Sequence, residues 1–334
     1  MPTVSRSICA LILLCFVAVF SAAANAQTAC KQRGDLDPRY CDEDGDLVAD
    51  TPTDPKLLQN PAALVFSYTP VEDPAVYENV FADLLAHLGK VTGKRIRWFP
   101  AESYAAQVEA MRSGRLHIAG VASGPTPFAV NLAGFVPIVA MQQSDGGYGY
   151  KLILITHRDS PIKTVADLKG KRVAHVAPSS NSGDIAPRAL FKALGVEPGK
   201  DYEVLYSGKH DNSIMGVVNR DYDAAPVANT VMLRMQARGM FKPDTLRIVY
   251  ESTEFPRTSF GVAHNLTPEL KAKIKEAFVT FDFKKSKLAT EFKDTERFAA
   301  IDYKVMWRDV RTIQQTSGVR YTQESLNKLG RKAE

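Results

Sequence analysis

A serine-rich turn is the part of this sequence best suited to chemistry. Residues 171–190, KRVAHVAPSSNSGDIAPRAL, read as a buried strand, a short polar turn and a helix. The first turn of a helix has backbone N–H groups without intrahelical partners and partial positive charge, so hydroxyl and amide side chains there can complete an anion site. Ser180, Asn181 and Ser182 stand at this point. The alternative is that Asn181 or Ser182 only caps the helix.

An acidic loop near the N-terminus is the second group suited to chemistry. From Cys41 the chain reads CDEDGDLVAD, which places carboxylates at relative positions 1, 3, 5 and 9 counted from Asp42. This spacing suits a hard cation and resembles the calcium loops of thrombospondin type 3 repeats. It departs from an EF-hand, because Leu47 stands at the usual glycine position. The alternative is a solvated acidic tail. The expected calcium ligands are Asp42, Asp44, Asp46 and Asp50.

The N-terminus has the pattern of an export signal. Arg6 precedes an apolar run over residues 8–20, and Ala24-Asn25-Ala26 forms a small-x-small cleavage site. The run is too short for a comfortable transmembrane helix, so we expect cleavage after Ala26 and a soluble protein of the periplasm. Cys30 and Cys41 then lie in an oxidising compartment, where we expect one disulfide between them.

The whole chain is long enough for two lobes with substantial cores. Its 334 residues carry a formal net charge of +5, which is only mildly basic. No Lys/Arg-rich block alternates with aromatic residues, so nucleic acid is not an expected ligand. Residues 27–60 are polar and aperiodic and form an appendage outside the lobes. We therefore expect a signal peptide over 1–26, the acidic N-terminal segment over 27–60, lobe 1 over 61–150, lobe 2 over 151–260 and a return to lobe 1 over 261–334.

Strand and helix patterns alternate after residue 61, which predicts an α/β protein with mainly parallel sheets and ligand crevices at the carboxyl ends of the strands. A Gly/Pro-rich loop is expected over 122–127. The predicted strands are 62–68, 94–99, 116–121, 149–156, 171–176, 202–206, 222–226, 246–250 and 259–264. The predicted helices are 74–92, 103–112, 164–168, 183–194, 211–219, 228–238, 267–281, 286–292 and a segment around 304–316.

The order of these pieces resembles the phosphate, phosphite and phosphonate-binding proteins of ABC importers, the PhnD-like family of type II periplasmic binding proteins. The resemblance rests on SYTPVEDPAVYENVFADLLAHL, YAAQVEAMRSGRLHIAGVASGPTP, HRDSPIKTVADLKGKRVAHVAPSSNSGDIAP and SGKHDNSIMGVVNRDYDAA. It implies two α/β lobes joined by two crossing strands, expected at 149–156 and 259–264, and a small oxyanion held between the lobes. It also implies a permease and ATPase as partners, no required cofactor and a monomer.

The resemblance also implies site residues. The family's anion turn falls on Ser180–Ser182, and its histidine-acid pair falls on His210 and Asp211. Asp211 would act on specificity, because a carboxylate accepts a hydrogen bond from a protonated ligand oxygen or an amine and repels a fully ionised ligand. Asp184 departs from a position that is often aromatic. The first-lobe candidates are Tyr68, Thr69, Ser123 and Thr126. Arg257 could form a pair with an oxyanion, or it could lie at the surface beside Glu254.

Two other functions share these residues. A sensor for a membrane kinase, or a binder of another anion, would use the same cleft. A hydrolase would use Ser180 or Ser182 with His210 and Asp211, but the chain has no G-x-S-x-G elbow and adjacent residues of an extended chain point in different directions. We therefore expect a binding protein and no catalytic residues. Trp98 and Trp307 are expected in the core rather than as stacking platforms for a ligand.

Overall fold

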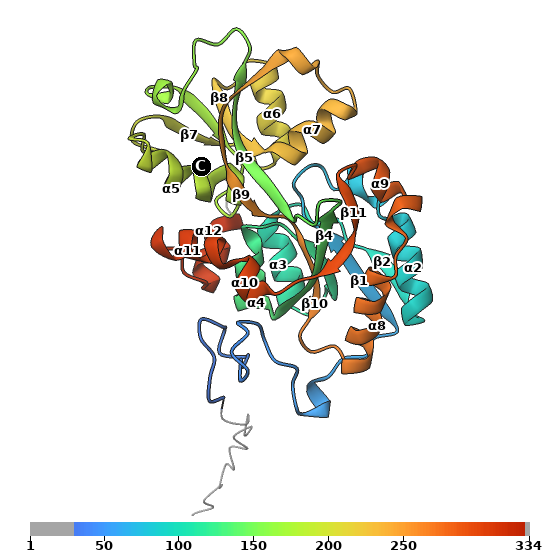
Figure 1. Ribbon diagram of the computed structural model, residues 1–334. Coiled ribbons are helices and arrows are strands. Elements are labelled where there is room, and N and C mark those ends of the chain that lie inside the picture. The colour runs from blue at the N-terminus through green and yellow to red at the C-terminus, as the bar shows by residue number, and fades with distance from the viewer. Residues whose placement is uncertain (1–29, 331–334) are drawn as a thin grey trace, which may run out of the picture.

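The computed structural model describes residues 30–330, which form two α/β lobes joined where the chain passes between two sheets (Figure 1). This confirms the expected two-lobed α/β class. The predicted signal peptide and its cleavage site lie outside the described residues. Within the described part of the chain, no helix combines the length and the apolar character needed to cross a membrane.

Lobe 1 is built on a six-stranded sheet of order β11-β4-β10-β3-β1-β2. Its strands are β1 (Ala63–Tyr68), β2 (Arg95–Trp98), β3 (Ile118–Val121), β4 (Phe135–Gln143), β10 (Ser259–Ala263) and β11 (Thr295–Ala300). Its helices are α1 (Ala75–Glu78), α2 (Ala82–Thr92), α3 (Tyr104–Arg112), α4 (Pro125–Ala133), α8 (Pro268–Val279) and α9 (Lys287–Glu291). The chain ends in α10 (Tyr303–Met306), α11 (Arg308–Thr316) and α12 (Gln323–Gly330).

Lobe 2 is built on a five-stranded sheet of order β7-β6-β8-β5-β9. Its strands are β5 (Gly149–His157), β6 (Arg172–His175), β7 (Glu203–Tyr206), β8 (Ala224–Ala228) and β9 (Leu246–Pro256). Its helices are α5 (Ala186–Ala193), α6 (His210–Val218) and α7 (Asn229–Ala237), with a π-helical turn over Asn181–Ile185 and short 3-10 helices over Val165–Leu168 and Pro243–Thr245.

The two sheets are mixed rather than mainly parallel. β1 pairs in parallel with β2 and β3, and β6 pairs in parallel with β7 and β8. The strands next to the lobe junction are antiparallel, because the chain leaves lobe 1 after β4 and returns to it as β10. The passages between lobes are therefore residues 144–148 and 257–258, with β5 inside the second sheet and β10 inside the first.

Several local expectations need correction. The helix expected over 74–92 is divided into α1 and α2. The loop expected over 122–127 already contains the start of α4, since Pro125 is tolerated in a first helical turn. The strands β4 and β11 and the helix α12 were not predicted.

The N-terminal segment lies against lobe 1 rather than forming a loose appendage (Figure 1). The disulfide Cys30–Cys41 is confirmed, with the two Cα atoms 5.6 Å apart. The Asp37 N–H donates to the Asn131 carbonyl at 2.8 Å. The segment also buries four apolar side chains, those of Leu36, Tyr40, Val48 and Ala49. Periodicity could not reveal this burial, because the segment is short and mostly polar.

Candidate functional site

A cleft of about 320 Å³ lies between the lobes, where the chain leaves the carboxyl ends of β1, β3 and β6. This is the position at which open α/β sheets commonly bind ligands. Lobe 1 lines it with Tyr68, Val71, Tyr104, Ala122, Ser123, Gly124, Met141, Thr290, Glu291 and Phe292. Lobe 2 lines it with Tyr150, Ser180, Asn181, Ser182, His210, Ala228, Thr230, Val231, Leu233, Arg234, Ala237 and Arg238. The residues between the lobes that line it are Arg257 and Thr258, and Lys293 and Asp294 complete its rim.

The serine-rich turn contributes its polar groups directly to the cleft. Ser180 is the cap of the π-helical turn, and its Oγ accepts the Gly183 N–H at 3.1 Å. Asn181 Nδ2 donates to the Tyr150 hydroxyl at 3.1 Å, while Asn181 Oδ1 is buried without a partner among the described residues. Capping therefore falls on Ser180, which leaves Asn181 and Ser182 oriented for other contacts.

Asp184 supports this turn from the side of lobe 2. Its carboxylate accepts hydrogen bonds from His175 Nδ1 at 2.8 Å, from Arg188 Nε at 3.0 Å and from the Tyr206 hydroxyl at 3.0 Å. Asp184 is 3% exposed and is not part of the cleft lining. The departure from an aromatic residue at this position thus changes the support beneath the turn and not the donors that face the cleft.

His210 is held as a neutral hydrogen-bond donor. Burial, with a further contribution from the charge of Arg234, lowers the pKa of His210 to about 3. Its Nδ1 accepts the Ala228 N–H at 3.3 Å, so the ring proton resides on Nε2. Nε2 lies 3.4 Å from Ser180 Oγ. The imidazole therefore presents an N–H at the cleft without a positive charge.

The first-lobe side of the site is the turn after β3. Ser123 is 3% exposed, and its Oγ has no hydrogen-bond partner among the described residues. Trp307 Nε1 donates to the Ser123 carbonyl at 3.0 Å, and Gln314 Nε2 donates to the Gly124 carbonyl at 2.8 Å. Trp307 thus lies in the core, as expected, and the C-terminal helices hold this turn from behind.

Gly124 is where the backbones of the two lobes come closest around the site. A Cβ atom at this position would lie 2.2 Å from the Ser179 carbonyl oxygen and 2.6 Å from the Asn181 nitrogen. Only glycine fits such an approach without displacing backbone. The turn after β3 and the serine-rich turn therefore meet in this structure, and their polar groups face one cavity.

These groups form what we call the donor cradle: Ser123, Tyr150, Ser180, Asn181, Ser182 and His210. Its members are uncharged hydroxyl, amide and imidazole groups. Burial raises the pKa of Tyr150, although hydrogen bonds with Ser182 and Asn181 act in the opposite direction, so the phenol keeps its proton at neutral pH. An array of this kind can surround a compact anion with converging O–H and N–H donors.

Next to the donor cradle, charged residues of both lobes form what we call the interlobe ion cluster: Glu72, Arg234, Arg238 and Glu291. Arg234 of α7 lies 3.2 Å from Glu72 and 3.4 Å from Glu291, and Arg238 lies 2.6 Å from Glu291 and also contacts Glu72. Glu72 is 1% exposed. Burial acts to lower the pKa of Arg234, but Tyr77 and Glu72 raise it above its ordinary value, so Arg234 keeps its positive charge.

Four of the predicted ligands lie outside the cleft lining or have other partners. Thr69 and Thr126 are buried outside the cleft lining, and Thr126 Oγ1 lies 2.9 Å from Ser259 Oγ. Asp211 also lies outside the lining and accepts the Asp73 N–H of lobe 1 at 3.1 Å. Arg257 does line the cleft, but its guanidinium donates to the Gly149 carbonyl at 2.8 Å and pairs with Asp294 rather than Glu254.

The same contacts bear on the hydrolase alternative. A catalytic triad requires a carboxylate that orients the histidine through its second ring nitrogen. Here that nitrogen, His210 Nδ1, accepts a backbone N–H, and Asp211 is engaged with Asp73. In this arrangement, no carboxylate among the described residues orients His210 as it would orient a catalytic base.

Sequence reasoning missed three residues that shape the cleft: Tyr104, Tyr150 and Arg234. Tyr150 opens the strand that follows the passage between lobes, so its position at the lobe junction was available as a signal. Arg234 lies within α7, and from the sequence alone an arginine in such a helix is expected at the surface. Its burial depends on contacts with lobe 1. Burial raises the pKa of Tyr104, whose hydroxyl also hydrogen-bonds with Ser180, so it remains protonated.

The two lobes, the paired passages between them and the enclosed cleft define a two-lobed substrate-binding protein. A family model described as "ABC transporter, phosphonate, periplasmic substrate-binding protein" matches residues 66–306. The chain therefore belongs to the family of periplasmic phosphonate-binding proteins of ABC transporters.

Relatives and solved structures agree with this membership. The phosphate-import protein PhnD of Mycolicibacterium smegmatis is 29% identical over 231 residues, which cover 65% of this chain and 71% of the relative. The phosphonates-binding periplasmic protein of Escherichia coli is 24% identical over 223 residues, 66% of each chain. PhnD1 of Prochlorococcus marinus, solved with methylphosphonate, is similar in fold, with a TM-score of 0.69, 18% identity and coverage of 78% of this chain and 99% of that one. A phosphonate-transporter binding protein from Pseudomonas aeruginosa has a TM-score of 0.70 at 22% identity, covering 81% of this chain and 94% of that one.

Proposed function

We propose that this protein captures a phosphonate in the interlobe cleft, in the periplasm, and delivers it to an ABC permease and its ATPase. The observation that carries the proposal is the donor cradle, in which uncharged donors of both lobes converge on one cavity. Ser123 Oγ and Asn181 Oδ1 are buried there without partners among the described residues. A bound phosphonate oxygen would accept from Ser123, and a protonated one would donate to Asn181.

The size of the cleft favours a phosphonate over a smaller oxyanion. A cleft of about 320 Å³ corresponds to roughly ten water-sized groups at about 30 Å³ each. Phosphate and methylphosphonate each have five non-hydrogen atoms and phosphite has four, whereas 2-aminoethylphosphonate has seven. The part of the cleft beyond the donor cradle is lined by apolar groups such as Val231 and Phe292. We therefore propose that the ligand carries a short organic substituent, with phosphite and phosphate as weaker ligands.

Several further properties belong to the same proposal. The protein is exported by a signal peptide cleaved after Ala26, acts as a monomer and needs no cofactor to hold the anion, because the protein itself supplies the donors. We place the anion on Ser123, Ser180, Asn181, Ser182 and His210, with Tyr68 as part of the cleft wall. Thr69, Thr126, Asp211 and Arg257 act around the site rather than on the anion.

Calorimetry with methylphosphonate, 2-aminoethylphosphonate, phosphite, phosphate and sulfate tests the proposal. Replacing Ser180, Asn181 and Ser182 together by Ala removes three donors, each worth about 1.5–3 kcal/mol when the partner is charged, so affinity should fall at least tenfold. Ser317→Ala on the surface is the control. Binding that is equal in wild type and triple variant would place the ligand elsewhere.

An importer and a sensor would share this cleft, so a second experiment separates them. Deletion of the gene should abolish growth on the bound phosphonate as the phosphorus source, and restoration should require the permease as well. Uptake that is unaffected by the deletion, together with a loss of phosphonate-dependent gene expression, would identify a sensor.

A further inference from the structure

The N-terminal acidic loop is a structured part of the protein outside the family match, which begins at residue 66. Its flanks are fixed to lobe 1: Arg39 donates to the Leu132 carbonyl at 2.7 Å, and the Tyr40 ring packs against His264 with centroids 4.7 Å apart. The properties of the family therefore do not explain why this loop is folded onto the lobe.

Three carboxylates converge in the loop. One oxygen each of Asp42, Asp44 and Asp46 lies within 4.8 Å of the other two. Such an arrangement of like charges is unfavourable unless a cation lies between them.

Asp42 provides the independent observation that points to a ligand. It is 1% exposed, and its Oδ1 has no hydrogen-bond partner among the described residues, while Oδ2 accepts the Leu47 N–H at 3.2 Å. An unpaired buried carboxylate oxygen costs several kcal/mol unless a charge or donor compensates it. Since the same side chain belongs to the converging group, a cation held there would supply the missing partner.

We propose that Asp42, Asp44 and Asp46 bind Ca²⁺. All three donors are hard oxygens, which Ca²⁺ prefers, and its flexible coordination number allows water to complete the shell around a partly exposed site. Asp50, which the spacing also suggested, instead accepts the Glu43 N–H at 2.7 Å and so holds the loop closed.

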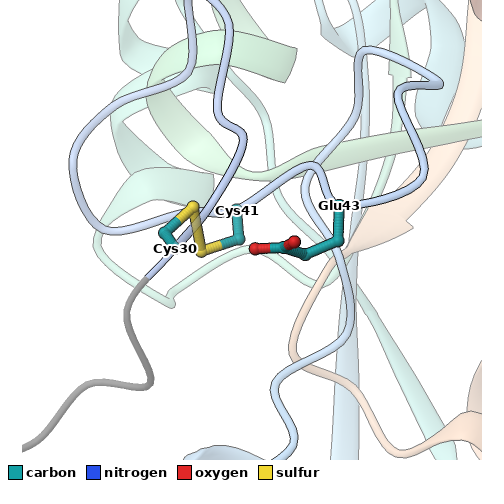
Figure 2. A group of neighbouring side chains, drawn as sticks. All are labelled: Cys30, Cys41 and Glu43. Atoms are coloured by element: carbon teal, nitrogen blue, oxygen red, sulfur yellow. A yellow bond between two sulfur atoms is a disulfide. The ribbon is translucent and has the colours of Figure 1, made fainter.

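Basic residues lie near the loop, and Arg33 and Arg311 line a small cavity together with Asp42. Lys304 donates to the Gly45 carbonyl at 2.8 Å, and no ion pair among the described residues joins it to the three carboxylates. A second group of neighbouring side chains, Cys30, Cys41 and Glu43, is unsuitable because both sulfurs belong to the disulfide (Figure 2). The bound Ca²⁺ would thus link the two ends of the loop next to that disulfide.

Calcium titration of the full mature chain by calorimetry tests the proposal, with Mg²⁺ as the competing cation. The double variant Asp44→Asn, Asp46→Asn keeps the side-chain shapes and should weaken Ca²⁺ binding at least tenfold. The matched control Glu43→Gln, Asp54→Asn removes the same number of charges from the same segment and should bind as the wild type does. A wild type without calcium heat, or a double variant that retains its affinity, would overturn the proposal.

Two further measurements separate this site from the anion cleft. Chelation should make Cys30–Cys41 more accessible to reductant in the wild type but not in the double variant, and equal reduction rates with and without chelator would contradict the proposal. The triple alanine variant of Ser180–Ser182 should retain full Ca²⁺ affinity. A tenfold loss in that variant would show that the heat comes from the cleft and not from the acidic loop.

Discussion

The donor cradle and the interlobe ion cluster lie next to each other at the cleft but differ in charge and in pairing. The donor cradle contains no charged side chain and has hydrogen-bonding atoms left unpaired, whereas the ion cluster pairs two arginines with two glutamates across the lobes. A neutral array gains its interactions only when an anion enters. A paired array already has its ion pairs in this structure. The comparison indicates that recognition and lobe closure rest on different residues.

The largest effect should come from breaking the ion cluster. Glu72→Ala leaves Arg234 and Arg238 with Glu291 alone, and loss of one partner of a buried pair costs about 3–5 kcal/mol of unfolding free energy. Urea denaturation measures it. The control Glu251→Gln removes half of an exposed pair with Lys151, whose atoms are 2.7 Å apart, and should cost less than about 1 kcal/mol. Equal effects of the two variants would remove the distinction drawn above.

Gly124→Ala should separate closure from folding. The added Cβ would meet the Ser179 carbonyl at 2.2 Å, so the lobes could not close around the ligand although each lobe remains intact. We expect affinity for methylphosphonate to fall about a hundredfold, or about 2.7 kcal/mol. Gly89→Ala, within α2, is the control. Solution scattering that shows the same ligand-dependent compaction in Gly124→Ala and wild type would refute the steric explanation.

Ser123→Ala removes one donor from the cradle. Its Oγ forms no hydrogen bond of normal geometry among the described residues, although Tyr150 lies close enough to interact with it, so the free protein should lose little, whereas the complex loses one hydrogen bond to a charged oxygen. We expect about tenfold weaker binding by calorimetry, with an unchanged urea midpoint. Thr69→Val removes a buried, equally unpaired hydroxyl outside the cleft lining and should change affinity less than about twofold. The reverse ranking would make Thr69 the ligand.

The last prediction concerns pH. The pKa of His210 is lowered to about 3 in the folded protein from an ordinary value of 6.5, so the unfolded chain binds the additional proton between these values. This residue therefore contributes stability that is present above about pH 6.5 and is lost as pH falls toward 3. In the folded protein the imidazole should show the Nε2–H tautomer by nitrogen NMR throughout pH 5–8. Titration within that range would mean that His210 is charged in the cradle.

The sequence predicted the parts of the site that follow local rules. Ser180 through Ser182, which line the cleft, were singled out because a strand, a polar turn and a helix start together favour an anion site, and His210 was singled out by the family resemblance. Most strands and helices after residue 61 were also predicted from their periodicity. The donor Tyr150 and the cluster member Arg234 were not, because their roles depend on a surface that comes from the other lobe.

The misplaced elements have related causes. β4 and β11 are paired only with strands distant in sequence, and β11 has a burial pattern with several half-exposed residues. Asp211 was assigned to the ligand from the family resemblance, and that role stays a prediction. In the structure its carboxylate accepts the Asp73 N–H of lobe 1, a contact that the sequence did not predict. Contacts between residues distant in sequence produce no periodic pattern in the neighbouring sequence, so they could not be predicted from it.

The hydrogen bonds from Trp307 and Gln314 to the carbonyls of Ser123 and Gly124 connect positions about 190 residues apart. A chain emerging with its N-terminus first completes the serine-rich turn and β3 long before α11 exists. Until then the turn after β3, which forms the first-lobe side of the cleft, lacks the two hydrogen bonds that set its orientation. The orientation of the turn after β3 therefore depends on residues near the end of the chain, and truncation before Trp307 would remove both hydrogen bonds that hold it.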